Sequence, residues 1–181
     1  MQESRDVQDA VEGEMATGSE AVKAPTDEWT AATLAHASAL LTLILGMAGG
    51  VGALVGPAVP LVMYFGYREK SRFVAFHALQ SFVYQVAGVL LYAILAAVLA
   101  VWVAIAWTVS GLLSAVLVGL LLMPFALLLT LLMVLLLVCA PFAWLGYGLY
   151  AAYQVYQGRD FRYWLIGEWL EREMKRREAI L

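Results

Sequence analysis

Charged residues are missing from two long stretches of this sequence. No Asp, Glu, Lys or Arg occurs in 29–67 or in 73–158. A helix needs about 20 apolar residues to cross a bilayer core of about 30 Å. The first stretch therefore has room for two short crossings, and the second for two generous crossings or up to four tight ones. The sequence thus predicts an all-α fold, a polytopic transmembrane helical bundle.

Cysteine and catalytic motifs are equally scarce. The single cysteine, Cys139, excludes an intramolecular disulfide. No Ser-His-Asp, HExxH, GxSxG or phosphate-loop pattern occurs, so we expect no enzymatic activity. The apolar blocks hold no carboxylate, which argues against proton-coupled pumping. The segment before Trp29 lacks the apolar core of a signal peptide and is too acidic for a transit peptide.

The charges that are present fall into three short zones. Residues 1–28 are acidic and of low hydrophobicity, which predicts a disordered cytoplasmic tail. The loop 68–72 and the segment 159–181 each carry an excess of Lys and Arg, which marks the cytoplasmic side of a membrane. The expected organisation is the acidic tail, a transmembrane domain over 29–158 and an amphipathic tail over 159–181. We expect both termini in the cytoplasm of a bacterium and the bundle in its cytoplasmic membrane.

Because both ends of each apolar block are assigned to one side, the predicted number of spans is four. The first covers 29–49. The second, over 53–66, is short, and Pro57 and Pro60 each remove an N–H donor and kink it. Lipid cannot satisfy the freed carbonyl groups, so this element is expected inside the bundle or close to an interface.

The block 73–158 is expected to form two long, tilted spans. The third span ends at about Trp107, where Thr108, Ser110 and Gly111 predict a weak break. A re-entrant or interfacial piece near 108–124 is an alternative for the connection. Pro124 and Pro141 are expected to interrupt the last span.

The C-terminal segment has the pattern of an amphipathic helix. Ile166, Leu170 and Met174 recur at helical spacing, and Leu165 and Trp169 are expected to widen that apolar face. Helices with Trp and Leu on one side and Lys or Arg on the other lie in the membrane interface. A helix that binds a partner protein is the alternative.

Polar side chains within the apolar blocks are the candidate functional residues, because they are costly in lipid unless paired. The offsets in the third span place a polar set on one helical stripe. With the histidine of the first span, this candidate polar seam comprises His36, His77, Gln80, Ser81, Tyr84 and Gln85. Two interpretations stay open: hydrogen bonds that hold helices together, or the lining of a pathway or pocket.

The two histidines are expected at similar depth. His36 lies about 10 Å beyond Trp29, and His77 about 7 Å beyond Arg72, at 1.5 Å per residue. This permits a hydrogen-bonded pair, a shared metal ion or bis-histidine haem ligation. Neither a third ligand nor a CxxCH motif accompanies them, so no cofactor and no metal are expected.

Four sequence runs resemble a known family. They are TxAxLAHxSALL from Thr30, GPxxPL from Gly56, KSRFVxFHALQS from Lys70, and GRDFRYxLIG from Gly158. In this order and spacing they resemble the Tic20-like family, small four-span bacterial proteins related to a chloroplast inner-envelope import component. A magnetosome membrane protein family shares the same pattern. The motif residues are Pro57, Pro60, Arg72, Phe73, His77, Gln80, Arg162 and Tyr163.

The Tic20-like resemblance implies a non-enzymatic role in protein translocation, as a scaffold or channel part. The chain departs from the family by extra length between Gln85 and Tyr147. An accessory subunit of a larger membrane complex is the second hypothesis, and a protein that binds a cofactor through His36 and His77 is the third. The expected partners are the bilayer, and membrane proteins or further copies of the chain. Nothing points to nucleic acid.

Overall fold

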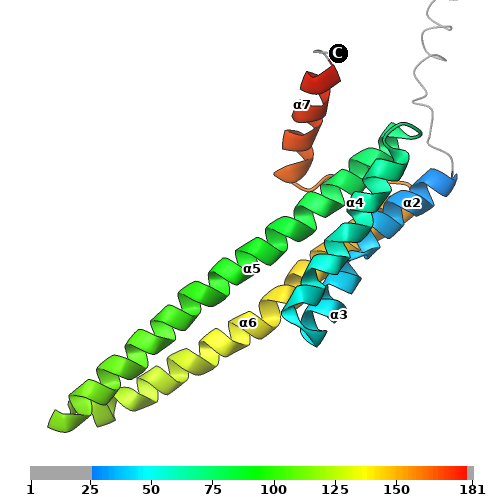
Figure 1. The fold of residues 1–181 in the computed structure, drawn as a ribbon. Helices are drawn as coiled ribbons and strands as arrows, with labels where there is room; N and C mark the ends of the chain where they lie inside the picture. The colour runs from blue at the N-terminus through cyan, green and yellow to red at the C-terminus, as the bar shows by residue number, and fades with distance from the viewer. Residues whose placement is uncertain (1–25, 179–181) are drawn as a thin grey trace, which may run out of the picture.

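A computed structural model describes residues 26–178 of the chain (Figure 1). Every regular element among these residues is helical. The predicted acidic tail lies outside the described residues up to position 25. The elements are α2 (Thr26–Ala37), α3 (Ala39–Ala48), the 3₁₀ helix η1 (Gly50–Leu54), α4 (Val55–Tyr67), α5 (Arg72–Leu113), the 3₁₀ turn η2 (Ser114–Val116), α6 (Val118–Tyr156) and α7 (Ile166–Glu178).

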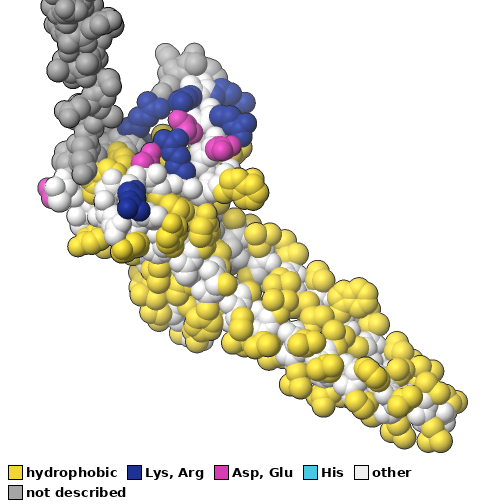
Figure 2. All heavy atoms as spheres, turned by 180° about the vertical axis from the view of Figure 1, so that it is seen from behind, with side chains coloured by type: hydrophobic (Ala, Val, Ile, Leu, Met, Phe, Trp, Pro, Cys, Tyr) yellow, Lys and Arg dark blue, Asp and Glu magenta, His cyan; other side chains and the backbone are white. Residues whose placement is uncertain are grey.

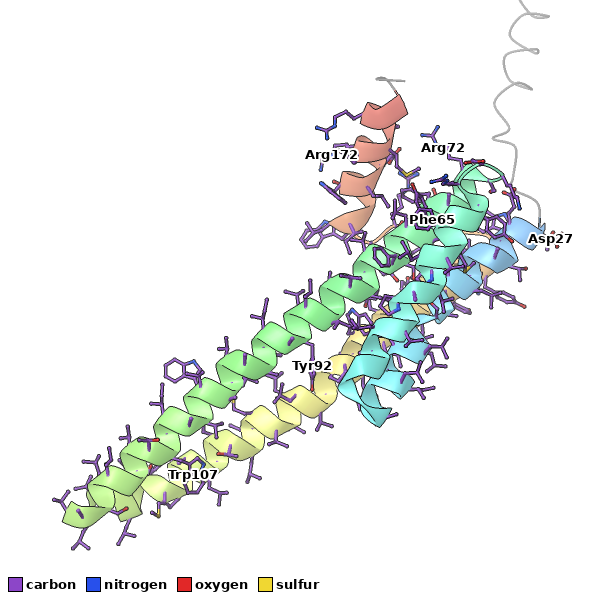
Figure 3. All side chains as sticks on the ribbon, viewed as in Figure 1. Asp27, Phe65, Arg72, Tyr92, Trp107 and Arg172 are labelled. Carbon is purple, nitrogen blue, oxygen red and sulfur yellow. The ribbon has the colours of Figure 1, made fainter. Side chains whose placement is uncertain are left out.

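Two long antiparallel helices, α5 and α6, are the axis of the molecule (Figure 1). They have 42 and 39 residues, so each is about 60 Å long at 1.5 Å per residue. The shorter helices α2, α3 and α4 pack against one half of this pair. The tyrosine hydroxyl of Tyr92 in α5 donates to the carbonyl of Leu137 in α6 at 3.2 Å, near the level where α3 and η1 end (Figures 1 and 3). We call residues 93–136, beyond this bond, the distal hairpin.

Three helical segments are long and apolar enough to cross a membrane: Thr26–Ala48, Arg72–Val116 and Val118–Tyr156. Helix α4 has 13 residues and falls short, so four spans are not confirmed. The all-helical, membrane-embedded class is confirmed. The first segment is bent at Ser38, whose hydroxyl donates to the carbonyl of Ala35 at 2.7 Å. The predicted Gly/Pro element packs against α5 and α3, with Pro57 and Pro60 buried.

The predicted break at 108–111 is wrong, and no re-entrant loop occurs there. Helix α5 continues to Leu113, and the chain reverses only at Ser114–Leu117. Unbonded backbone groups are costly in lipid, so the helix continues through these residues. The serine hydroxyls find acceptors within it: that of Ser110 donates to the carbonyl of Ala106, and that of Ser114 to the carbonyl of Ser110, both at 2.8 Å.

One further sequence expectation needs correction. Pro124 and Pro141 do not interrupt α6, which runs through both. In α7, Leu170 packs inward with 3% of its surface exposed, whereas Trp169, and Leu165 just before the helix, are 54% and 72% exposed. Their place in the apolar face of an interfacial helix stays a prediction.

Charge and hydrophobicity are segregated along the molecule. On the face shown in Figure 2, Lys, Arg, Asp and Glu gather at one end, and hydrophobic side chains cover the rest. We call the loop 68–72, the linker 157–165 and α7 the charged end. Helix α5 begins at this end. The hydroxyl of Ser71 accepts a hydrogen bond from the backbone N–H of Val74 at 3.2 Å, which satisfies one free donor of the first turn of α5.

Candidate functional site

The candidate polar seam lies inside the bundle, next to the charged end. Its members come from α2 and α5, and the linker 157–165 folds back over them. All six side chains are buried, with exposed fractions between 0% and 7%: His36, His77, Gln80, Ser81, Tyr84 and Gln85. The structure therefore brings together every residue of the predicted seam. It does so within the protein rather than along an open surface.

The two histidines contact each other. Nε2 of His36 lies 3.1 Å from Nδ1 of His77, and Nδ1 of His36 lies 3.2 Å from the hydroxyl of Tyr163. Both rings are fully buried. In the tautomers that satisfy this network, the Tyr163 hydroxyl donates to Nδ1 of His36, and Nε2 of His36 donates to Nδ1 of His77. This chain of bonds joins α2, α5 and the linker.

Asp160 extends this chain to the surface. Its carboxylate lies 3.3 Å from Nε2 of His77, within ion-pair distance but outside hydrogen-bond geometry. The guanidinium of Arg162 donates to the same carboxylate at 3.0 Å and also pairs with Glu171 of α7. His77 and Arg162 hold the pKa of Asp160 below its ordinary value, and Asp160 in turn raises the pKa of Arg162.

A second group of hydrogen bonds centres on Gln85. Its amide donates to Ser38 at 2.9 Å and to Ser81 at 3.0 Å, and its carbonyl accepts from Thr42 at 2.6 Å. The hydroxyls of Ser38 and Ser81 both donate to the carbonyl of Ala35. One glutamine thus ties the bend between α2 and α3 to α5.

Aromatic rings close the seam on the α6 side. The ring of Tyr84 stacks between Tyr163 and Trp144, with centroid distances of 4.1 and 5.0 Å. The Tyr84 hydroxyl donates to the carbonyl of Trp144 at 2.5 Å. Burial raises the pKa of Tyr163, so its hydroxyl keeps its proton and acts as a donor.

Some of the motif residues also lie at this site, whereas Pro57 and Pro60 lie in α4. Phe73 packs on Trp29 and on His77, with ring centroids 4.5 and 4.6 Å apart. Arg162 lies over the ring of Phe76. Gln80 donates weakly to the carbonyl of Phe161 at 3.5 Å. The contacts of Asp160, Ser38 and Thr42 were missed from the sequence, because no periodic pattern links the linker or the bend to α5.

The arrangement does not fit a haem held by the two histidines. Two imidazoles on opposite sides of a haem iron, each at about 2 Å, would have nitrogens about 4 Å apart, whereas Nε2 of His36 and Nδ1 of His77 are 3.1 Å apart. Within residues 26–178 no group of three His, Cys, Asp or Glu side chains is placed to hold a metal. What the site can do is hold three segments of chain together by hydrogen bonds.

Acid is expected to loosen the linker through Asp160. Because the pKa of this group is lowered in the folded protein, its contribution to stability is present above its unfolded value of about 4 and is lost as the pH falls through the folded value. Thermal unfolding in detergent between pH 3 and pH 7 should show a steeper loss below pH 4 for the native chain than for Asp160→Asn. Asp27→Asn, at the exposed start of α2, is the control and should follow the native profile. Coincident profiles for native chain and Asp160→Asn would contradict the role of this carboxylate.

Comparison with known proteins identifies the family. A model described as the magnetosome magnetite crystal formation protein family matches residues 27–170. No curated protein and no solved structure matches the chain. The Tic20-like assignment is therefore wrong, and the translocation role that it implied loses its support. The match covers well over half of the chain, so the chain belongs to the magnetosome family.

Proposed function

We propose that this member of the magnetosome magnetite crystal formation protein family is a non-enzymatic accessory protein of the membrane in which the crystal forms. The observation that carries the proposal is the family match over 27–170, which includes the whole polar seam and the linker that closes it. The protein acts through contacts with lipid and with other membrane proteins. Its location is the magnetosome membrane or the cytoplasmic membrane of a bacterium.

The polar seam serves this function by holding the helices of the bundle together through hydrogen bonds. Its side chains bond to one another, to Tyr163 and to backbone carbonyls. The groove between α3, α5 and α6 shares no residue with the seam and is lined by apolar residues such as Leu43, Met47 and Leu95. A seam of this kind fixes the bundle, and the outer apolar surface is what partners meet.

The topology that we propose has four helical segments within the apolar phase: α2 with α3, η1 with α4, α5, and α6. Both ends of 29–158 then lie at one membrane face, which the basic residues of 68–72 assign to the cytoplasm. Helix α7 lies at the interface of this face. Its exposed Trp169 and the nearby Trp164 and Leu165 meet lipid, and Arg172 and Lys175 meet headgroups.

The role in crystal formation is tested in a magnetite-forming bacterium that carries this chain. Deleting the gene should change the mean crystal length seen by electron microscopy, and the native gene should restore it. An unchanged distribution of crystal sizes would overturn the proposal.

Partner contacts are tested by photo-crosslinking in the same membranes. Probes belong at exposed positions such as Val62, which is 70% exposed, since Gln80 and Gln85 are fully buried. A probe at Gln85 is the matched buried control. Repeated capture of the same one or two membrane proteins from Val62, and none from Gln85, supports the proposal. Capture of lipid alone would contradict a role through protein contacts.

A further inference from the structure

The long hairpin does not match the thickness of a membrane. Helix α5 is about 60 Å long, and no charged residue occurs between Phe73 and Gly158. The hydrocarbon core of a bilayer is about 30 Å thick, and about 40–45 Å with its headgroups. The usual helix tilts of 0–40° do not remove this excess.

The short helices show where along α5 and α6 the length of one bilayer core ends. Trp29 and Phe73 are in ring contact, so α2 and α5 start at one depth. From Trp29 to Ala48 the chain rises about 29 Å, which is one bilayer core. The hydrogen bond of Tyr92 to Leu137 marks about this level in α5 and α6. The distal hairpin adds roughly another 30 Å beyond it.

The distal hairpin is apolar on all sides. Figure 1 shows it extending alone past α3 and η1, and few of its side chains are buried: Leu99, Ser110 and Ala126. Its turn is as apolar as its flanks, since Leu112 and Leu117 are 74% and 73% exposed. If the short helices stood upright in the bilayer, all of this surface would project into water.

The polar side chain of Ser114 in the turn does not require water either. The hydroxyl of Ser114 is already bonded to the carbonyl of Ser110. The other turn far from the charged end, 49–52, is glycine-rich and also uncharged. Charged residues of the described chain therefore anchor only one end of the molecule.

We propose that the molecule lies obliquely in a single bilayer, anchored at its charged end, with acyl chains covering the distal hairpin on every side. A helix of about 60 Å fits a layer of about 30 Å when its axis is inclined by roughly 60° from the membrane normal. The turn 114–117 then stays within the far headgroup boundary, and the turn 49–52 lies near mid-depth. The occupant of this surface is lipid hydrocarbon, not a second protein.

The inference rests on the membrane-embedded part of the proposed function and not on the role in crystal formation. A failed orientation test would leave the crystal experiment unaffected, and an unchanged crystal size would leave the orientation standing.

Cysteine labelling tests the depth of both turns. Cys139→Ser provides the background, since Cys139 is the single native cysteine. Single cysteines are then placed at Ala115 in the distal turn, at Gly50 in the short turn and at Glu69 in the charged end. A side chain at Gly50 meets no atom within 4 Å, so that substitution is tolerated. The probe is a membrane-impermeant maleimide applied to either face of sealed vesicles.

We expect Glu69→Cys to react from one face, and Ala115→Cys and Gly50→Cys to react at least tenfold more slowly from both. Denaturation in SDS should make all three equally reactive. Reaction of Gly50→Cys or Ala115→Cys from the face opposite to Glu69→Cys would overturn the oblique placement. Disulfide-linked dimers through Ala115→Cys would also overturn it, because a second copy would then cover the turn.

Polarised infrared spectroscopy on oriented bilayers measures the inclination of α5 from the membrane normal in the chain without substitutions. Isotope-labelled carbonyls in the alanines of 96–106 report on α5 alone. An inclination near 60° is expected, and one of 40° or less would overturn the proposal.

Discussion

Gly56→Ala is expected to lower the free energy of unfolding by about 3 kcal/mol, because helices α3 and α4 touch at this glycine. A Cβ atom at position 56 would lie 2.5 Å from backbone atoms of Thr42 and closer still to its hydroxyl oxygen. Backbone atoms cannot rotate away, so the two helices must separate. Overpacking of this kind costs about 1–3 kcal/mol, and occasionally more.

Separation of α3 from α4 should also break a hydrogen bond of the polar seam. Thr42 donates to Gln85 at 2.6 Å, and a shift of α3 breaks this bond within the bundle. We therefore place the effect of Gly56→Ala at the upper end of the range. The measurement is reversible unfolding of the full chain in mixed micelles with increasing SDS, followed by circular dichroism.

Gly66→Ala is the matched control for this prediction. Gly66 lies in the same helix, and a Cβ atom there meets nothing within 4 Å. Alanine is preferred over glycine in a helix by up to about 1 kcal/mol, so this variant should be as stable as the native chain or slightly more so. Equal loss in both variants would show that glycine at position 56 matters for backbone freedom rather than for helix contact.

The polar stripe of α5 was predictable from the sequence because helical spacing is a local property. His77, Gln80, Ser81, Tyr84 and Gln85 lie on one face of any straight helix, and a polar face in lipid must turn toward other helices. The depth of His36 follows in the same way from its distance to Trp29. The contact between the histidines also needed the packing of α2 on α5, which depends on residues far apart in the chain.

The end of α5 was not predictable from composition. Thr108, Ser110 and Gly111 have low helix propensity in water, and this favoured a break. In an apolar environment an unbonded backbone group is far more costly, so the helix continues and the serine hydroxyls bond to the preceding turn. The sequence also gave no signal for the fold of 157–165 over the seam, since this segment has no regular structure.

The family was not separable on motifs alone. The runs around Lys70 and Gly158 led to the Tic20-like family, whereas the family model that matches 27–170 is the magnetosome one. In this structure the same residues pack the charged end: Phe73 on Trp29, and Arg162 over Phe76. Residues that hold a bundle together constrain its fold, and they do not specify what the bundle does.

His36→Leu is expected to lower the free energy of unfolding by about 2 kcal/mol. The imidazole bonds to both His77 and Tyr163, and leucine leaves a ring nitrogen and a hydroxyl without partners. Hydrogen bonds between membrane helices contribute only about 0.6 kcal/mol on average. The larger value applies here because each unpaired buried group costs about 1–3 kcal/mol, and both partners are 2% exposed or less.

A double-mutant cycle separates this network from simple loss of packing. Tyr163→Phe removes one hydroxyl and keeps the stacking on Tyr84, so it should cost about 1 kcal/mol. In the double variant the hydroxyl that His36→Leu would leave unpaired is absent. The combined loss should therefore be smaller than the sum of the single losses by at least 0.5 kcal/mol. Tyr156→Phe, at a side chain that is 74% exposed, is the control for loss of a tyrosine hydroxyl. Additive losses would mean that His36 and Tyr163 stabilise the bundle independently, and that the hydrogen bond between them contributes little.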